Sequence, residues 1–224
     1  GWRDKVGEFG YNITANISRY KNEVTRLGSS DLFNDTRLSK VNITTVGQPV
    51  GMFYGYQIDG IYQNEQDVIS SGVLPYGVAT ENDLVASAWV GRYKMKDVNN
   101  DGKIDADDRT IIGNPHPDLT GGFNISLTWR DFDLSTYMYY SIGNDLYKHY
   151  EYYTMFGNLQ SNYSKDRLAK SWDPVNNPNG IYPLWTTTST EGPEAGNESN
   201  SNYVQDGSYL RMQTLPCMIF ASLQ

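Results

Sequence analysis

The sequence predicts an all-β fold: a fragment of an antiparallel transmembrane β-barrel, with about four strands and two long extracellular loops. Three observations lead to this prediction. The 224 residues include 18 tyrosines, seven phenylalanines and five tryptophans, together with 21 glycines, and such a mixture favours strands and turns over helical bundles. Three segments alternate apolar and polar residues, and the connections between them differ greatly in length. Transmembrane barrels combine tight turns at one end with long loops at the other.

The alternating segments are residues 9–18, 122–129 and 132–140. Only Arg130 and Asp131 separate the second from the third, so these two segments should form a tight hairpin. Ten residues are enough for a tilted strand to cross a bilayer, whereas strands of globular proteins usually have five or six. The side chains expected to face lipid are Phe123, Ile125, Leu127, Leu134 and Met138.

A soluble β-sandwich explains the alternation as well, because its apolar face packs on a second sheet. The connections favour the barrel. Residues 20–120 and 142–207 form two stretches far longer than the loops that compact soluble domains usually carry. The barrel is therefore the preferred interpretation and the sandwich its alternative.

Composition excludes several other classes. The net charge is −8, and no cluster of Lys and Arg forms the basic footprint of a nucleic-acid-binding protein. Cys217 is the single cysteine, so no disulfide forms within the chain. No run approaches the roughly 20 apolar residues of a membrane helix. The first residues lack the apolar core of a signal peptide, and we expect the natural N-terminus to be missing.

Within the long connections, two short helices and one exposed segment are predicted. Asn64 precedes an acidic first turn and is placed to cap a helix. Residues 164–170 form the second predicted helix, with Leu168 and Trp172 on one side. Residues 186–202 are rich in Thr, Ser, Asn, Gly and Glu, and we expect them to be exposed.

The sharpest local motif is residues 97–108, DVNNDGKIDADD. Oxygen-bearing side chains stand at positions 1, 3, 5, 9 and 12, with Gly102 at position 6, which is the ligand spacing of a calcium loop. An acidic turn without an ion is the alternative. The predicted ligands of a structural Ca²⁺ are Asp97, Asn99, Asp101, the Lys103 carbonyl, Asp105 directly or through water, and Asp108.

Catalysis is not predicted, and we expect no enzyme. His116 and His149 lack ligand spacing to each other, and no nucleophile, zinc or phosphate-loop motif is present. The acidic pair Glu151 and Asp166 is one of many that arise by chance. Aromatic residues of the connections suit stacking on sugar rings and packing of the loops equally well: Tyr54, Tyr56, Tyr62, Trp89, Tyr152, Tyr153 and Trp185.

Several phrases, in order, resemble the C-terminal part of the SusC/RagA family of TonB-dependent outer-membrane transporters. They lie at residues 47–56 (GQPVGMFYGY), 59–63, 93–105, 108–115, 118–124, 132–135, 172–174 and 203–211. The resemblance covers residues 1–211, and it makes the chain a C-terminal portion of the transporter barrel with loops at 20–120 and 142–207. Residues 212–224 depart from the family pattern and suggest a frame-shifted or truncated tail, in which Pro216 would interrupt a ladder.

The resemblance implies a protein of the cell outer membrane in Bacteroidetes that imports nutrients, either glycans or peptides. It also implies three kinds of partner: a SusD-like surface lipoprotein, TonB through the missing N-terminal part, and outer-membrane lipid. The alternative function is a soluble, secreted, β-rich carbohydrate-binding module with a structural calcium.

Overall fold

The computed structural model describes residues 1–28, 31–34, 40–156, 162–185 and 193–219. The chain divides into two compact units. Unit 1 comprises Gly1–Asn22, Asn114–Leu146 and Asp206–Gln224, and unit 2 comprises Glu23–Gly113 and Tyr147–Gln205. None of the helices in the described residues has both the length and the apolar character needed to span a lipid bilayer.

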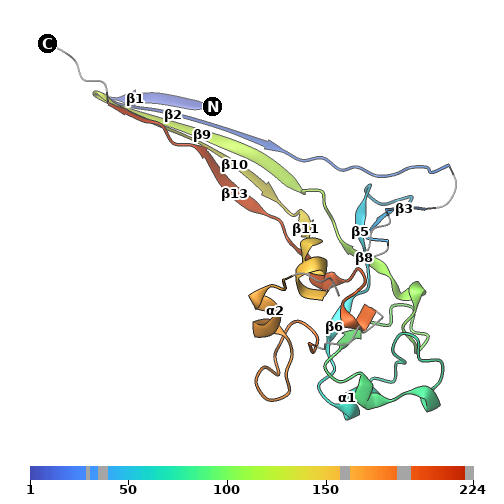
Figure 1. Cartoon of the computed structure of the whole chain (residues 1–224). Coiled ribbons are helices and arrows are strands. Elements are labelled where there is room, and N and C mark those ends of the chain that lie inside the picture. Colours follow the sequence, from blue (N-terminus) through green and yellow to red (C-terminus); the bar gives the residue numbers. More distant parts are fainter. Residues whose placement is uncertain (29–30, 35–39, 157–161, 186–192, 220–224) are drawn as a thin grey trace. The chain divides into compact units, whose positions relative to one another are not determined.

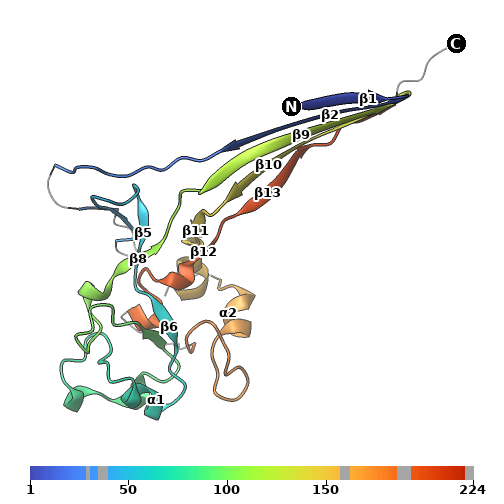
Figure 2. The ribbon, with the colours of Figure 1, turned by 180° about the vertical axis from the view of Figure 1, so that it is seen from behind.

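Unit 1 is a single antiparallel sheet with the strand order β1-β2-β9-β10-β13, in which β14 also pairs with β10. Figure 1 and the reverse view in Figure 2 both show these strands side by side. The chain is thus mostly β with antiparallel sheets, as predicted. The strand bounds are β1 Trp2–Val6, β2 Phe9–Ser18, β9 Leu119–Trp129, β10 Phe132–Ile142, β13 Tyr209–Thr214 and β14 Cys217–Ile219.

The three strands predicted from alternation are β2, β9 and β10. β2 has the predicted bounds, whereas β9 begins three residues earlier than predicted and β10 ends two residues later. The predicted hairpin joins β9 to β10, with Trp129 paired to Phe132 across the turn. Arg130 adopts a positive φ of 52°, the backbone conformation that a two-residue turn between right-twisted strands requires.

The register of the strands sorts their side chains onto two faces, because directly opposed residues lie on the same side of a sheet. Ile125 pairs with Ile13 of β2 and with Thr136 of β10, while its neighbour Ser126 pairs with Asn12 and Ser135. One face is therefore apolar and the other mainly polar. The apolar face carries Phe9, Tyr11, Ile13, Ala15, Phe123, Ile125, Leu127, Trp129, Phe132, Leu134, Met138, Tyr140, Leu210 and Met212.

Pro216 lies at an interruption of the last ladder. β13 and β14 both pair with β10, and Leu215 and Pro216 separate them. The Pro216 carbonyl still accepts a hydrogen bond from the Ser135 amide at 3.2 Å, so pairing continues past the proline. A proline has no N–H to give to a ladder and is tolerated at such an irregularity.

Unit 2 is built from short strands and single helical turns. Its largest sheet has the order β3-β4-β5-β8, while β6 pairs with β7; β11 pairs with β12, and each of these two strands has residues in both units. The strands are β3 Leu32–Asn34, β4 Asn42–Thr44, β5 Met52–Gly55, β6 Ile58–Ile61, β7 Tyr93–Met95, β8 Thr110–Gly113, β11 Asp145–Tyr147 and β12 Val204–Asp206. The helices are α1 Glu65–Ser70, α2 Lys165–Lys170, the π-helix η4 Tyr152–Phe156, and the 3₁₀ turns η1 Glu81–Asp83, η2 Ala86–Ala88, η3 Ala106–Asp108, η5 Pro193–Ala195 and η6 Ser201–Tyr203.

Both predicted helices are confirmed. The Asn64 side chain accepts the Asp67 amide at the start of α1, and the Ser164 side chain accepts the Asp166 amide at the start of α2. The predicted shared face of Leu168 and Trp172 is wrong: Leu168 is exposed, whereas Trp172 is buried. The helix ends at Lys170, so the helical spacing between these two residues does not exist.

The core of unit 2 is rich in tyrosine. Its buried members are Val41, Tyr56, Tyr93, Met95, Ile104, Met155, Phe156, Tyr182 and Tyr203. Tyrosine suits a core made of loops, because its ring fills space while its hydroxyl satisfies nearby backbone groups. The Tyr203 hydroxyl, for example, donates to the Gly196 carbonyl at 2.6 Å.

The prediction that residues 186–202 are exposed is wrong for residues 193–200, and residues 186–192 lie outside the described part. Glu194, Ser199 and Asn200 are buried. The polar side chains are accommodated because they bond to backbone: Ser199 Oγ donates to the Tyr54 carbonyl at 2.7 Å. This contact explains Gly55, since a Cβ there would come within 2.3 Å of the Ser199 carbonyl oxygen.

Candidate functional site

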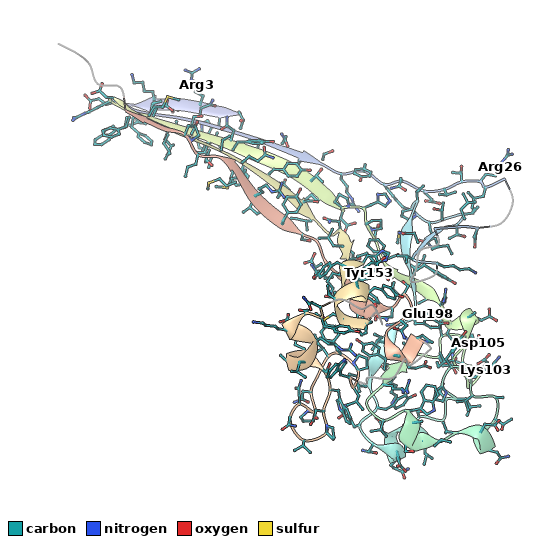
Figure 3. The ribbon with its side chains drawn as sticks, in the orientation of Figure 1. Arg3, Arg26, Lys103, Asp105, Tyr153 and Glu198 are labelled. Atoms are coloured by element: carbon teal, nitrogen blue, oxygen red, sulfur yellow. The ribbon has the colours of Figure 1, made fainter. Side chains whose placement is uncertain are left out.

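The Asp97–Asp108 loop lies between β7 and β8 in unit 2 and ends in η3, and Figure 3 labels Lys103 and Asp105 on it. Ile104, at the aliphatic position of the motif, is buried in the core. On the other side, the Gly102 carbonyl accepts the Leu74 amide at 2.9 Å, and the Ile104 amide donates to the Leu74 carbonyl at 2.8 Å. The backbone of the loop is therefore held in place at its middle, and of its acidic side chains only Asp108 is buried.

Asp97 organises the first half of the loop. Its Oδ1 accepts the Asn100 amide at 2.6 Å, and its Oδ2 accepts the Gly102 amide at 2.8 Å. Asn100 and Gly102 have positive φ angles of 61° and 83°, in the left-handed region where asparagine and glycine are most at ease. The turn predicted from Gly102 is thus present.

Lys103 lies among the carboxylates of the second half. Its Nζ is 2.6 Å from Asp105 Oδ2 and 3.7 Å from Asp101 Oδ2. This contact raises the pKa of Lys103 and lowers that of Asp105, whose charged form also accepts the Asp107 amide. Asn99 completes the group, with its Nδ2 3.2 Å from Asp101 Oδ2.

Asp108 has a different place from the other predicted ligands, because it is fully buried. Its Oδ1 accepts the Val98 amide at 2.9 Å and its Oδ2 accepts the Asp105 amide at 2.8 Å. Asp105 in turn caps η3, so the two aspartates form a reciprocal capping box. Asp108 thereby ties together the two ends of the loop.

The structure brings Asn99, Asp101, Lys103 and Asp105 together. Asp97 accepts backbone amides of the same loop, and Asp108 is buried. Within the described ranges, no three or more His, Cys, Asp or Glu side chains are grouped closely enough to hold a metal ion. The oxygens of Asp97, Asn99 and Asp101 suit a calcium ion chemically, and a carboxylate oxygen that accepts one amide keeps a second lone pair. The role of these residues as ligands stays a prediction.

The residues considered for catalysis are engaged in other contacts. His149 stacks on Tyr153, which Figure 3 labels, with ring centroids 5.9 Å apart. Glu151 pairs with Lys148 at 2.8 Å, and Asp166 pairs with Lys170 at 2.8 Å. His116 lies in unit 1, where its ring meets Tyr20 edge-on.

Of the seven loop aromatics named above, Tyr54, Trp89 and Tyr152 are half-buried, and the other four form two groups. Tyr56 and Tyr62 are almost fully buried, so they pack the loops against one another and are not accessible for stacking on a sugar. Tyr153 and Trp185 are 38% and 46% exposed, so part of each ring is accessible to a ligand.

A cavity of about 140 Å³ in unit 2 had no signal in the sequence pattern. Its polar wall includes Arg92, directly before β7, and Arg167 from α2, and the Arg167 guanidinium lies 5.1 Å from the ring of Phe156. Nothing in the local sequence marks Arg167, because arginine in a short polar helix is ordinarily solvated. The remaining lining residues are Ser87, Ala88, Val90, Met155, Tyr163, Pro183, Leu184, Trp185, Ala195 and Asn197.

Comparison with known proteins identifies relatives over nearly the whole chain, although no family model matches. TonB-dependent receptor P3 of Formosa agariphila is 31% identical over 217 residues, covering 93% of this chain and 19% of the relative. TonB-dependent receptor P26 of the same organism is 29% identical over 226 residues, covering 94% of this chain and 20% of the relative. The chain therefore spans about a fifth of the length of these curated relatives.

Solved structures agree with this result at the level of the fold. A RagAB peptide importer in a closed-closed state matches with a TM-score of 0.62 and 20% identity, over 95% of this chain and 21% of that one. A second structure, of the RagAB peptide transporter, matches with a TM-score of 0.63 at the same identity and coverage. The chain is thus homologous to TonB-dependent receptors across nearly its whole length, and the predicted resemblance to that family is confirmed.

Proposed function

We propose that the chain is part of the wall of a TonB-dependent outer-membrane transporter, together with the loop structure attached to that wall. The transporter imports nutrients, either glycans or peptides, and performs no chemistry of its own. Its partners are a SusD-like surface lipoprotein, TonB and outer-membrane lipid. Two findings support this proposal: the homology to TonB-dependent receptors and the fold shared with RagAB importers.

The observation that carries the proposal is the apolar face of the sheet in unit 1. Large side chains on this face are exposed, including Phe9, Ile13, Trp129, Phe132 and Leu134. Burying such a side chain is worth about 1.5–3 kcal/mol, so a soluble sheet would cover this face. A lipid bilayer covers it without any further protein.

A soluble carbohydrate-binding module remains the second candidate, favoured by the exposed rings of Tyr153 and Trp185. Both rings are suited to stacking on sugars. This candidate does not account for the apolar face of unit 1, because a sandwich would bury the strands' apolar side chains against a second sheet.

Membrane fractionation of cells that produce the full-length protein separates the two candidates. We expect the protein in the membrane pellet, resistant to a carbonate wash and released by detergent. A soluble carbohydrate-binding module would appear in the soluble or secreted fraction without detergent, and that result would refute the transporter proposal.

We further propose that the Asp97–Asp108 loop binds one Ca²⁺ through the ligands predicted above. Five carboxylates lie within the twelve residues of this loop, and Lys103 offsets only part of their mutual repulsion. Even a weak site, with a Kd of about 10⁻⁴–10⁻³ M, would be filled in a calcium-rich external medium.

Calorimetry on the full-length protein in detergent tests this proposal. Calcium should give binding heat at millimolar concentration, and Asp97→Ala combined with Asp101→Ala should abolish it. Asp107→Ala is the matched control, because Asp107 is exposed and outside the predicted ligand set. If the double variant gave the same heat of calcium binding as the unchanged protein, the motif would be an acidic turn and not a calcium site.

A further inference from the structure

The cavity beside α2 contains a buried cation whose hydrogen-bonding capacity is not used. The Arg167 side chain is only 7% exposed. Within the described ranges, its Nε and Nη1 have no hydrogen-bond partner, and no acidic side chain forms an ion pair with it. Burial lowers the pKa of Arg167, and the groups that oppose this effect are tyrosines. A charge taken out of water without a partner is costly, so native structures rarely retain one.

The cavity concentrates positive charge. Arg92 is the second cation on its wall, and its Nε is already held by the Ala88 carbonyl at 2.7 Å. The described lining residues include no Asp or Glu. Burial lowers the pKa of Arg92, and Glu194 opposes this effect; the Glu194 Oε1 accepts the Tyr76 amide at 2.6 Å. A site with two guanidinium groups and no carboxylate on its wall is suited to an anion.

The rest of the wall limits what the anion is attached to. Phe156 covers one side of the Arg167 guanidinium at 5.1 Å, and Val90, Leu184 and Trp185 add further apolar surface. A cavity of about 150 Å³ lined by apolar side chains holds benzene, and this cavity has a volume of about 140 Å³. A bare inorganic anion would leave the apolar part of the wall without contacts.

We propose that this cavity binds a carboxylate attached to an apolar body about the size of a benzene ring. A guanidinium group carries its N–H donors in a planar fork that matches the two oxygens of a carboxylate. The apolar body lies against Phe156, Leu184 and Trp185. Both a free organic acid and the C-terminal carboxylate of a peptide that ends in an apolar residue provide this chemistry.

Fluorine NMR of 4-fluorobenzoate with the full-length protein in detergent measures this binding. We expect saturable binding of 4-fluorobenzoate and at least tenfold weaker binding of neutral 4-fluorobenzamide. Arg167→Met should weaken the acid at least tenfold, and Arg167→Lys, which keeps the charge but loses the fork, should weaken it by a smaller factor. Arg26→Met is the matched control, because Arg26 is exposed in the same unit and labelled in Figure 3.

Competition of 4-fluorobenzoate with Gly-Gly-Phe and with the C-terminal amide of this peptide distinguishes the two sources of the carboxylate, a free organic acid and a peptide C-terminus. Displacement by the peptide acid alone identifies a peptide C-terminus, whereas displacement by neither identifies a free acid. Equal binding of fluorobenzoate and fluorobenzamide, or unchanged binding in Arg167→Met, would overturn the proposal. If Arg167→Met does not fold, Ala88→Trp is the second variant. Ala88 is exposed and lines the cavity, so the added ring should block binding of 4-fluorobenzoate. Unimpaired binding in this variant would also overturn the proposal.

Discussion

Arginine in place of Ile125 should prevent assembly of the sheet in a membrane, at a cost of about 2–4 kcal/mol near the bilayer midplane. Ile125 lies near the middle of β9, on the apolar face, between Ile13 and Thr136. The charged side chain would have to enter the hydrocarbon region there. We expect the amount of heat-modifiable, protease-resistant protein in membranes to fall at least tenfold, as measured by gel mobility with and without boiling.

Ser126→Arg is the matched control, one residue further along the same strand. Ser126 pairs with Asn12 and Ser135 on the polar face, so an arginine there should reach water in the barrel interior and be tolerated. Equal loss of assembly at both positions would contradict the assignment of the two faces.

Replacing Asp108 by alanine should open the Asp97–Asp108 loop. The change removes the acceptor of two amides, those of Val98 and Asp105, at a position that is fully buried. Each amide left without a partner costs about 1–3 kcal/mol, so the free energy of opening should fall by about 2–6 kcal/mol. Hydrogen exchange measured by mass spectrometry should show at least tenfold faster exchange over the loop.

Asp107→Ala provides the comparison for that experiment. Asp107 is adjacent in sequence but exposed, and the hydrogen bond that its backbone amide donates to Asp105 remains after truncation. The hydrogen-exchange rates of the Asp107→Ala variant should match those of the unchanged protein. If Asp108→Ala also left exchange unchanged, Asp108 would not be the residue that ties the loop together.

Features set by local physics were predictable from the sequence. The period-two alternation located β2 to the residue, and two residues between alternating segments located the β9–β10 hairpin. The cap at Asn64 followed from the same local chemistry, because a side-chain oxygen at that position satisfies the first free amides of a helix. Gly102 marked a backbone position with positive φ.

Features set by contacts between distant segments were not predictable. Residues 193–200 resemble an exposed loop in composition, yet Ser199 and Asn200 are buried, with Ser199 bonded to the Tyr54 carbonyl 145 residues away. Asp108 fits the ligand spacing of a calcium loop, but its two oxygens are directed to backbone amides. The environment of Arg167 depends on Phe156 and Trp185, and neither its burial nor its missing partners can be read from the sequence of α2.

The most direct test of the central claim is a cysteine scan along β9 in the membrane-embedded full-length protein. Cys217 is first replaced by serine, and a fluorescent label is then placed singly at positions 123–127. Lipids brominated near the bilayer centre should quench labels at Phe123, Ile125 and Leu127, whereas aqueous iodide should quench labels at Asn124 and Ser126. Quenching by iodide at all five positions, without alternation, would show that the apolar face does not meet lipid and would contradict a transmembrane wall.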